Sequence, residues 1–268
     1  MVNVLKANGI AEPFDENKLR TSMTRTGISQ SQQDKVILNL KPSLHENIPT
    51  AEIYEHVTRS LQEQSHLVKL RYSLKQAIME LGPTGYPFED FVSEILKSKG
   101  YLTQVRSILT GRCVNHEIDV IAEKAGTEKL MIEAKYHNAP GIHTDVHVSL
   151  YTKARFDDLK EKYHFDRAWL FTNTRITSDA LAYALCVNMG VVSWNYPQNE
   201  SLRDLTEKEK LYPVTILSSL SQNQKQVLLE NHTVSIKQIL NNNDCLDLLA
   251  IEKVKKEQII EESKNFLS

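Results

Sequence analysis

The sequence has few cysteines, no CxxC motif and an odd number of thiols. Its 268 residues include Cys113, Cys186 and Cys245, which lie far apart in the chain. Structural zinc sites and disulfide-stapled folds both need closely spaced or paired cysteines. We therefore expect neither, and we expect a protein of a reducing compartment.

The sequence also lacks a long apolar run. Its most apolar stretch, LAYALCVNMGVVSW, is short and interrupted, whereas a membrane-spanning helix needs about 20 apolar residues. The beginning, MVNVLKANGIAEPFD, has no apolar core of the kind found in signal peptides. We therefore expect a cytoplasmic protein without membrane contact.

The chain has almost no net charge. It carries 32 lysines and arginines against 34 aspartates and glutamates, a formal net charge of −2. Proteins that bind nucleic acid normally present a basic surface, so a nucleic-acid partner would have to meet a local patch. The apolar content of 41% is ordinary for a globular chain, which excludes wholesale disorder.

Turn-forming residues divide the chain at GPTGYP, residues 82–87. We predict a first domain over 1–82, a second over 83–210 and a helical segment over 211–268. In the first domain, Asn8-Gly9 predicts a tight hairpin turn between VNVLK and IAEPF, with helices following. In the second, helices and strands alternate, which predicts a layered α/β domain.

Three charged residues interrupt two neighbouring apolar segments that are typical of buried strands. Asp119 lies in HEIDVIAE, and Glu133 and Lys135 share one face of LMIEAK because strand side chains alternate. Two carboxylates and the carbonyl of Ala134 would suit Mg²⁺ or Mn²⁺, and Lys135 could orient a nucleophile or screen negative charge. An ordinary ion pair at the edge of a sheet is the alternative interpretation.

The region from Tyr86 to Pro197 resembles the PD-(D/E)XK nuclease superfamily, in its Mrr-like restriction-endonuclease branch. The resemblance implies a mixed-sheet α/β/α fold and a Mg-dependent endodeoxyribonuclease in which Asp119, Glu133 and Lys135 are catalytic. The segments that carry the resemblance occur in the family's order: YPFEDFVSEILKSKGY, EIDVIAE, IEAK and FTNTRITSDALAYA.

The same resemblance implies a fourth catalytic residue and two contacts to DNA. The glutamate of the family's first helix matches Glu89, with Glu94 as an alternative on a solvated face. Lys153 and Arg155 follow where the family often places a polar helix residue, and they are predicted to contact phosphate. Here the usual glutamine is missing, and a solvated helix face is the alternative. His137, His143 and His147 fit no zinc spacing.

The first domain resembles the ATP-cone, a regulatory nucleotide-binding module. The matching segments are VLKANGIAEPFDENKLRTSM, IPTAEIYEHV and LRYSLKQAI. The resemblance implies a regulatory ATP or dATP held by Lys6, Glu12 and Lys18, with Thr50 and Tyr54 facing the base and sugar. Ala7 stands where the family commonly has a second basic residue, and a module without ligand is the alternative.

The carboxy-terminal segment is faintly similar to a helix-hairpin-helix, but its bend, ENHT, lacks the glycine that such hairpins use. A packing element or a dimer contact is the alternative.

From the nuclease and ATP-cone resemblances we predict a metal-dependent endonuclease of double-stranded DNA, regulated by ATP or dATP and assembled as a homodimer or a higher oligomer. The alternatives are a nucleotide-sensing DNA-binding regulator that does not cut, and an RNA nuclease.

Overall fold

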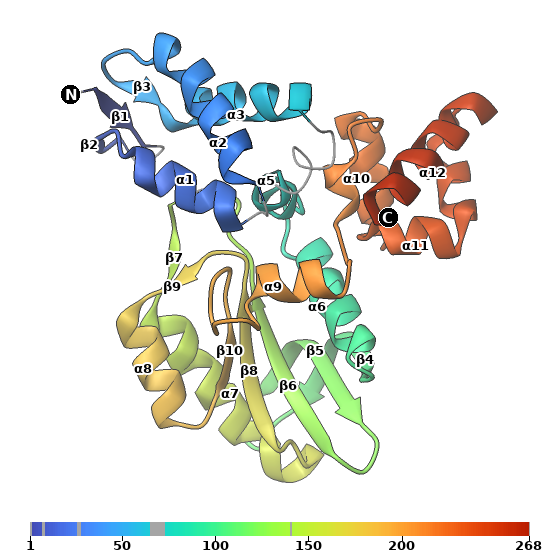
Figure 1. Cartoon of the computed structure of the whole chain (residues 1–268). Helices are drawn as coiled ribbons and strands as arrows, with labels where there is room; N and C mark the ends of the chain where they lie inside the picture. Colours follow the sequence, from blue (N-terminus) through green and yellow to red (C-terminus); the bar gives the residue numbers. More distant parts are fainter. Residues whose placement is uncertain (1, 7–8, 26–27, 65–72, 140, 268) are drawn as a thin grey trace. The chain divides into compact units, whose positions relative to one another are not determined.

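The structure is a computed structural model that describes residues 2–6, 9–25, 28–64, 73–139 and 141–267 (Figure 1). The chain forms two compact units, which divide between Lys75 and Gln76. The division therefore falls earlier than the predicted boundary after residue 82. Residues 211–268, which the sequence suggests are a separate segment, belong to the second unit.

The first unit combines a three-stranded sheet, in the order β2-β1-β3, with helices. Its elements are β1 (Asn3–Leu5), β2 (Ala11–Pro13), α1 (Glu16–Arg25), α2 (Gln30–Leu40), η1 (Lys41–Ser43), β3 (Ile48–Pro49) and α3 (Thr50–Gln64). The predicted pairing of β1 with β2 is antiparallel, as in a hairpin. Asp15 caps α1 as the sequence indicates, because its carboxylate accepts the backbone N–H of Asn17 at 2.9 Å.

The core of the first unit is formed by apolar residues of the helices and of β3. It includes Met23, Val36, Ile48, Val57 and Leu61. Ala7 and Asn8 of the expected hairpin turn, and residues 70–72 of the LRYSLKQAI segment, lie outside the described residues. Helix α5 (Leu74–Met79) crosses the division between the units.

The second unit is built on a five-stranded mixed sheet in the order β10-β8-β6-β5-β4. β4, β5 and β6 pair antiparallel, whereas β6, β8 and β10 pair parallel. The elements before residue 211 are α6 (Tyr86–Ser98), β4 (Leu102–Thr110), β5 (Asn115–Lys124), β6 (Glu128–Lys135), β7 (His143–Thr144), α7 (Val146–Tyr163), β8 (Arg167–Thr172), β9 (Arg175–Ile176), α8 (Ser178–Cys186), β10 (Gly190–Val192) and α9 (Leu202–Lys208).

Helices cover both faces of this sheet, which gives the predicted α/β/α layering (Figure 1). Alternate residues of β6 show the two sides. Met131 belongs to the core cluster that contains Leu159 of α7 and Ala184 of α8. Tyr136, directly after β6 and of opposite parity, packs instead against Phe88 of α6, with ring centroids 5.7 Å apart. Glu133 and Lys135, which share the parity of Met131, therefore face α7.

Asp158 of α7 anchors the connection between β4 and β5. Its carboxylate accepts the N–H groups of Cys113 at 2.9 Å and Val114 at 3.4 Å, and it lies 2.9 Å from Nε2 of His116. The hydrogen bond with His116 is the main reason why the pKa of Asp158 is lowered to about 2. Gly111 leaves room for this carboxylate, because a Cβ there would lie 2.0 Å from it.

We expect this anchor to make stability depend on pH in acid. A carboxyl whose pKa falls from 3.8 to about 2 on folding stabilises the ionised native state above about pH 4. That stabilisation is lost as the pH falls from about 4 to about 2. Urea unfolding at several pH values should show a shallower acid loss for Asp158→Asn than for the wild type. Asp157→Asn, at the exposed next position, should keep the wild-type profile.

The last part of the second unit is helical, as predicted. It contains η2 (Val214–Ile216), α10 (Gln222–Glu230), α11 (Ile236–Asn241), η3 (Asn243–Leu249) and α12 (Lys253–Leu267). Its chain returns to the start of the unit, because the Thr215 hydroxyl donates to the Ala77 carbonyl at 2.6 Å. Leu228, Leu229, Ile236 and Ile239 are buried. No described helix of the chain has the length and apolarity that a bilayer crossing requires.

Candidate active site

The register of the sheet brings Asp119 level with Glu133. Val120 lies opposite Ile132 in the antiparallel pair of β5 and β6, so the preceding residue of β5 faces the next residue of β6. The Asp119 carboxylate accepts the backbone N–H of Ala134 at 2.7 Å. The two acidic side chains thus occupy facing positions on neighbouring strands, beside Lys135 on the same side of β6.

Arg155 of α7 is the counter-ion of Glu133. One of its guanidinium nitrogens donates to the Glu133 carboxylate, and Arg155 as a whole is 5% exposed. The guanidinium lies 5.0 Å from the centroid of the Tyr151 ring, while its Nε is buried without a hydrogen-bond partner among the described residues. The structure therefore places Arg155 inside the site rather than on the solvated helix face that the sequence leaves as an alternative.

Glu89 of α6 completes the acidic group and has its own arginine. Arg106 of β4 lies 3.2 Å from Glu89 and 2.7 Å from Asp90 through its two terminal nitrogens. The second oxygen of Asp90 lies 2.9 Å from Nδ1 of His232, in the loop between α10 and α11. A continuous set of polar contacts therefore joins the loop between α10 and α11 to Glu89 of α6.

Arg106 reaches these acids through an unusual backbone conformation. Its φ of 51° is in the left-handed region, which costs a residue with a Cβ roughly 1–2 kcal/mol. The register of β4 is unchanged on either side, with Val105 opposite Val120 and Ser107 opposite Ile118. Arg106 is therefore opposite Asp119, and the strained residue adjoins the acidic group, where such strain tends to occur.

The acidic groups repel one another. Burial, and then the charge of Asp119, raise the pKa of Glu89 to about 7, and Arg106 opposes this rise. Burial, followed by Asp119, likewise raises the pKa of Glu133, and burial raises that of Asp119 itself. Burial is the largest cause for all three carboxyls, and raised pKa values in a group of buried acids are typical of functional sites.

The chemistry of this donor set fits a hard divalent cation, but the side chains are held by other partners. Among the described residues, no three carboxylate, histidine or cysteine groups gather closely enough to hold a metal ion. Glu89 is turned to Arg106, Glu133 to Arg155 and Asp119 to a backbone N–H. To bind Mg²⁺ with Asp119 and the Ala134 carbonyl, Glu133 would have to exchange its guanidinium for the cation.

The structure does not bring the other predicted residues of the second unit to the acidic group of Asp119, Glu133 and Glu89. Lys153 pairs with Asp157 one turn along α7, and its ammonium lies 5.8 Å from the Phe156 ring centroid. Glu94, the alternative to Glu89, binds Lys97 at 2.8 Å. His137, His143 and His147 form no metal-binding group within the described part of the chain.

Sequence reasoning missed Asp90, Arg106 and His232. The adjacent acids of YPFEDF on an otherwise apolar helix were a signal that a cation lies nearby, because buried carboxylates need compensation. Nothing local identified Arg106 as that cation. His232 is 142 positions from Asp90 in the chain, so no sequence spacing could link the two.

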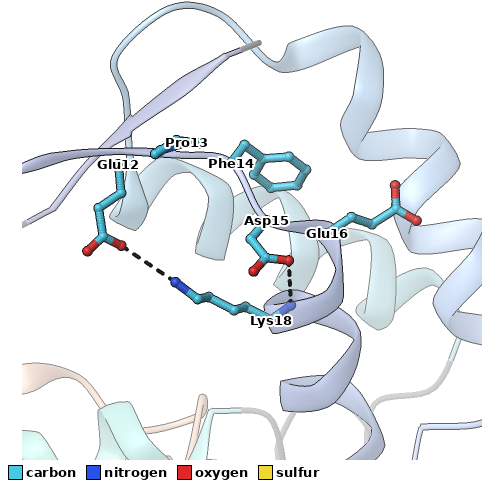
Figure 2. A pocket seen from close by; sticks show the side chains of 6 residues that line it. All are labelled: Glu12, Pro13, Phe14, Asp15, Glu16 and Lys18. Carbon is cyan, nitrogen blue, oxygen red and sulfur yellow. Dashed lines mark hydrogen bonds and ion pairs between the residues drawn. The ribbon is translucent and has the colours of Figure 1, made fainter.

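In the first unit, the predicted nucleotide residues meet around one glutamate. Lys6 lies 2.8 Å and Lys18 lies 3.7 Å from the Glu12 carboxylate. Figure 2 shows Lys18 extended toward Glu12 at the edge of an open cavity of about 430 Å³. The Thr50 hydroxyl donates to the Leu5 carbonyl at 3.1 Å, and Tyr54 is half-buried on α3.

The lining of this cavity is acidic. It consists of Glu12, Pro13, Phe14, Asp15, Glu16 and Lys18. A triphosphate would meet more carboxylates than lysines there, and it would have to take both lysines from Glu12. The hydrogen bond with Lys6 is the main cause of the lowered pKa of Glu12.

Comparison with known proteins divides the second unit into two matched parts. Residues 82–198 match the restriction endonuclease family Mrr_cat. Residues 212–267 match the family described as AF1548-like, C-terminal. The second unit thus carries a restriction endonuclease-like domain, as the sequence predicts, followed by a helical family segment.

Individual proteins are also similar to parts of this chain. An uncharacterized protein of Archaeoglobus fulgidus is 43% identical over 126 residues, which are 47% of this chain and 71% of that protein. The crystal structure of AF1548, a protein of unknown function, is 33% identical and covers 68% of this chain and 97% of its own, with a TM-score of 0.59. A repair endonuclease from Pyrococcus abyssi, at 20% identity over 38% of this chain and 41% of its own, reaches a TM-score of only 0.30, too low to support an argument.

Proposed function

Because the chain belongs to the AF1548-like family and carries a restriction endonuclease-like domain, we propose that it is a metal-dependent DNA endonuclease. One observation carries the proposal. Asp119 and Glu133 face each other on neighbouring strands, both with raised pKa values, beside the amine of Lys135. Buried carboxyls whose pKa values are raised by burial and by a neighbouring acid are typical of functional sites.

In this mechanism Asp119, Glu133 and the Ala134 carbonyl would hold Mg²⁺ or Mn²⁺. The bound cation would supply an activated water and polarise the phosphodiester. Lys135 orients the water or stabilises charge on the phosphate oxygens, since an amine at this position can donate to either. Arg155, which pairs with Glu133 here, would be able to bind a phosphate if it left that carboxylate. Glu89, held by Arg106, lies near enough to Asp119 to add a further acidic group.

The direct test is cleavage of a supercoiled plasmid by the purified full chain with Mg²⁺ or Mn²⁺. We expect nicked or linear product that disappears with EDTA and with Glu133→Gln, which keeps the shape of the side chain. Lys129→Gln, at the start of the same strand, serves as the matched control. An intact plasmid with every metal, together with cleavage of RNA, would move the assignment to an RNA nuclease.

Metal binding distinguishes the nuclease from the alternative, a DNA-binding regulator that does not cut. If the plasmid stays intact but the protein retards DNA in a gel, calorimetric titration of Mn²⁺ decides. Equal heats for the wild type and Asp119→Asn would support the regulator, because they would show that the carboxylates hold no metal.

We also propose that the first unit binds ATP or dATP and regulates cleavage. The support is the convergence of Lys6 and Lys18 on Glu12, since lysines that meet at one point can bind a phosphate chain. The proposal includes a homodimer or larger assembly that responds to nucleotide. Calorimetry and sedimentation with each nucleotide test it, with Lys18→Ala as the variant. No heat and an unchanged profile at saturating concentration would contradict nucleotide binding by the first unit.

A further inference from the structure

His232, in the loop between α10 and α11, connects the carboxy-terminal segment to the first helix of the restriction endonuclease-like domain. Its Nδ1 lies 2.9 Å from one carboxylate oxygen of Asp90, in α6. The imidazole is the donor, because an ionised carboxylate only accepts hydrogen bonds. His232 belongs to the AF1548-like match, residues 212–267, and Asp90 to the restriction endonuclease match, residues 82–198. The contact therefore joins the two family segments next to the candidate active site.

The other oxygen of Asp90 is bound by Arg106. One terminal nitrogen of Arg106 lies 2.7 Å from that oxygen, and the second terminal nitrogen lies 3.2 Å from Glu89. Both acids are 8% exposed, so each depends on donors from the protein. One guanidinium is thus shared by two buried carboxylates, while His232 gives Asp90 a second donor. How Arg106 is shared depends on the direction in which the Asp90 carboxylate points.

Both partners of Asp90 have a left-handed backbone conformation. The angle φ is 51° at Arg106 and 59° at His232, a region that residues with a Cβ rarely adopt. Two hydrogen bonds hold the turn at His232: its N–H donates to the Leu229 carbonyl at 3.1 Å, and its carbonyl accepts from the Gln238 side-chain amide at 3.1 Å. Strained residues persist where the surrounding structure fixes them, and they cluster at functional sites. The structure therefore fixes both donors of Asp90.

Loss of the imidazole would change how Arg106 is shared. The His232 side chain is 68% exposed, so little packing would be lost with it. Asp90, however, would lose the donor to one of its oxygens. A carboxylate in this position gains by accepting both terminal nitrogens of one arginine, the bidentate arrangement. Glu89 would then lose its cation, although the charge of Asp119 repels it.

We propose that His232 is a positioning residue for the nuclease: it holds Asp90 so that Arg106 stays on Glu89. The inference rests on the proposed nuclease function, in which Glu89 adds a further acidic group beside Asp119. It gives the AF1548-like segment a part in cleavage, exerted through Asp90 and Arg106 rather than by contact with DNA.

The test measures kcat and KM for nicking of a plasmid by the full chain at saturating Mg²⁺ and constant pH. His232→Gly removes the imidazole and suits the left-handed backbone, so the variant adds no strain. We expect kcat to fall about 10-fold, the lower end of the loss when a partner that orients a site residue is removed. KM for DNA should stay unchanged, because a positioning residue does not touch the substrate.

Two further variants separate orientation from general effects. His232→Asn should restore most of kcat, because its amide nitrogen is bonded to Cγ, as Nδ1 is, and can donate to Asp90. Asparagine also tolerates a positive φ. His164→Gly is the matched control, because His164 is an exposed histidine with a φ of 55° at the end of α7. This variant should keep the wild-type kcat.

Unfolding in urea tests the same link without cleavage. If His232 controls how Arg106 is shared, His232→Gly should lower the urea midpoint of the wild type more than that of a Glu89→Gln protein. Glutamine carries no charge and therefore needs no counter-ion. The two substitutions should thus be non-additive, as expected for residues in one network.

A wild-type kcat for His232→Gly would overturn the inference and leave the nuclease standing. A raised KM with unchanged kcat would also overturn it, because the exposed imidazole would then be a contact to DNA. The same holds for a loss that His232→Asn does not restore or that His164→Gly shares, and for additive shifts in urea. If the wild type cuts nothing, the nuclease is wrong, and the urea measurements alone decide whether His232 positions Glu89.

Discussion

Replacing Lys135 with alanine is expected to slow plasmid cleavage about 10²–10³-fold, the usual loss when one preorganised donor leaves an active site. The amine lies on the same side of β6 as Glu133, one pleat further along the strand. Nicking rates at saturating Mg²⁺ measure the effect. Stability should change little, because no described carboxylate lies within salt-bridge distance of this lysine.

The matched control is Lys129→Ala at the other end of β6. Its ammonium lies 5.5 Å from the Phe165 ring centroid and 3.9 Å from Glu123, far along the strand from Asp119. It should cut at close to the wild-type rate. A Lys135→Ala protein that cuts as fast as this control would contradict a catalytic role for the amine.

Replacing Arg155 with methionine is expected to destabilise the metal-free protein by about 3–5 kcal/mol, the cost of leaving a buried acid without its counter-ion. Methionine keeps the apolar bulk beside Tyr151 while removing the charge. Urea unfolding in EDTA measures the loss. Added Mg²⁺ or Mn²⁺ should restore most of it, because a cation bound at Glu133 takes over the compensating charge and stabilises the native state.

A double variant separates charge from packing. Glu133→Gln combined with Arg155→Met removes both members of the pair and should recover much of the lost stability in EDTA, but metal should no longer add to it. Arg175→Met, at an exposed position of β9, controls for loss of an arginine. If Arg155→Met unfolds at the wild-type urea concentration in EDTA, the ion pair with Glu133 is not important in solution.

Much of the candidate site follows from the strand pattern. HEIDVIAE and KLMIEAK each alternate in a way that predicts a strand, and a short connection between them puts Asp119 opposite Glu133. The mixed sheet between helices follows from the order of these elements. The direction of Arg155 does not, because apolar residues lie around much of α7 and the sequence does not show which side faces the sheet.

Other parts of the site depend on contacts that no local pattern records. Arg106 looks like an ordinary residue of a polar edge strand, and only its positive φ brings it to Glu89 and Asp90. The ATP-cone resemblance rests on scattered residues of a small domain. The structure gives that region paired strands and helices beside an acidic cavity. The family matches cover residues 82–198 and 212–267 and do not include it.

The hydrogen bond between His232 and Asp90 has a consequence for genetics. A stop codon after residue 211 would leave the whole restriction endonuclease-like match, residues 82–198, in the translated chain. Yet it would remove His232, the partner of Asp90, and Thr215, whose hydroxyl donates to the Ala77 carbonyl. Asp90 and Ala77 both lie far upstream of the stop. A nonsense allele that loses only residues 212–268 should therefore have the effect of a mutation in α6, where Asp90 lies.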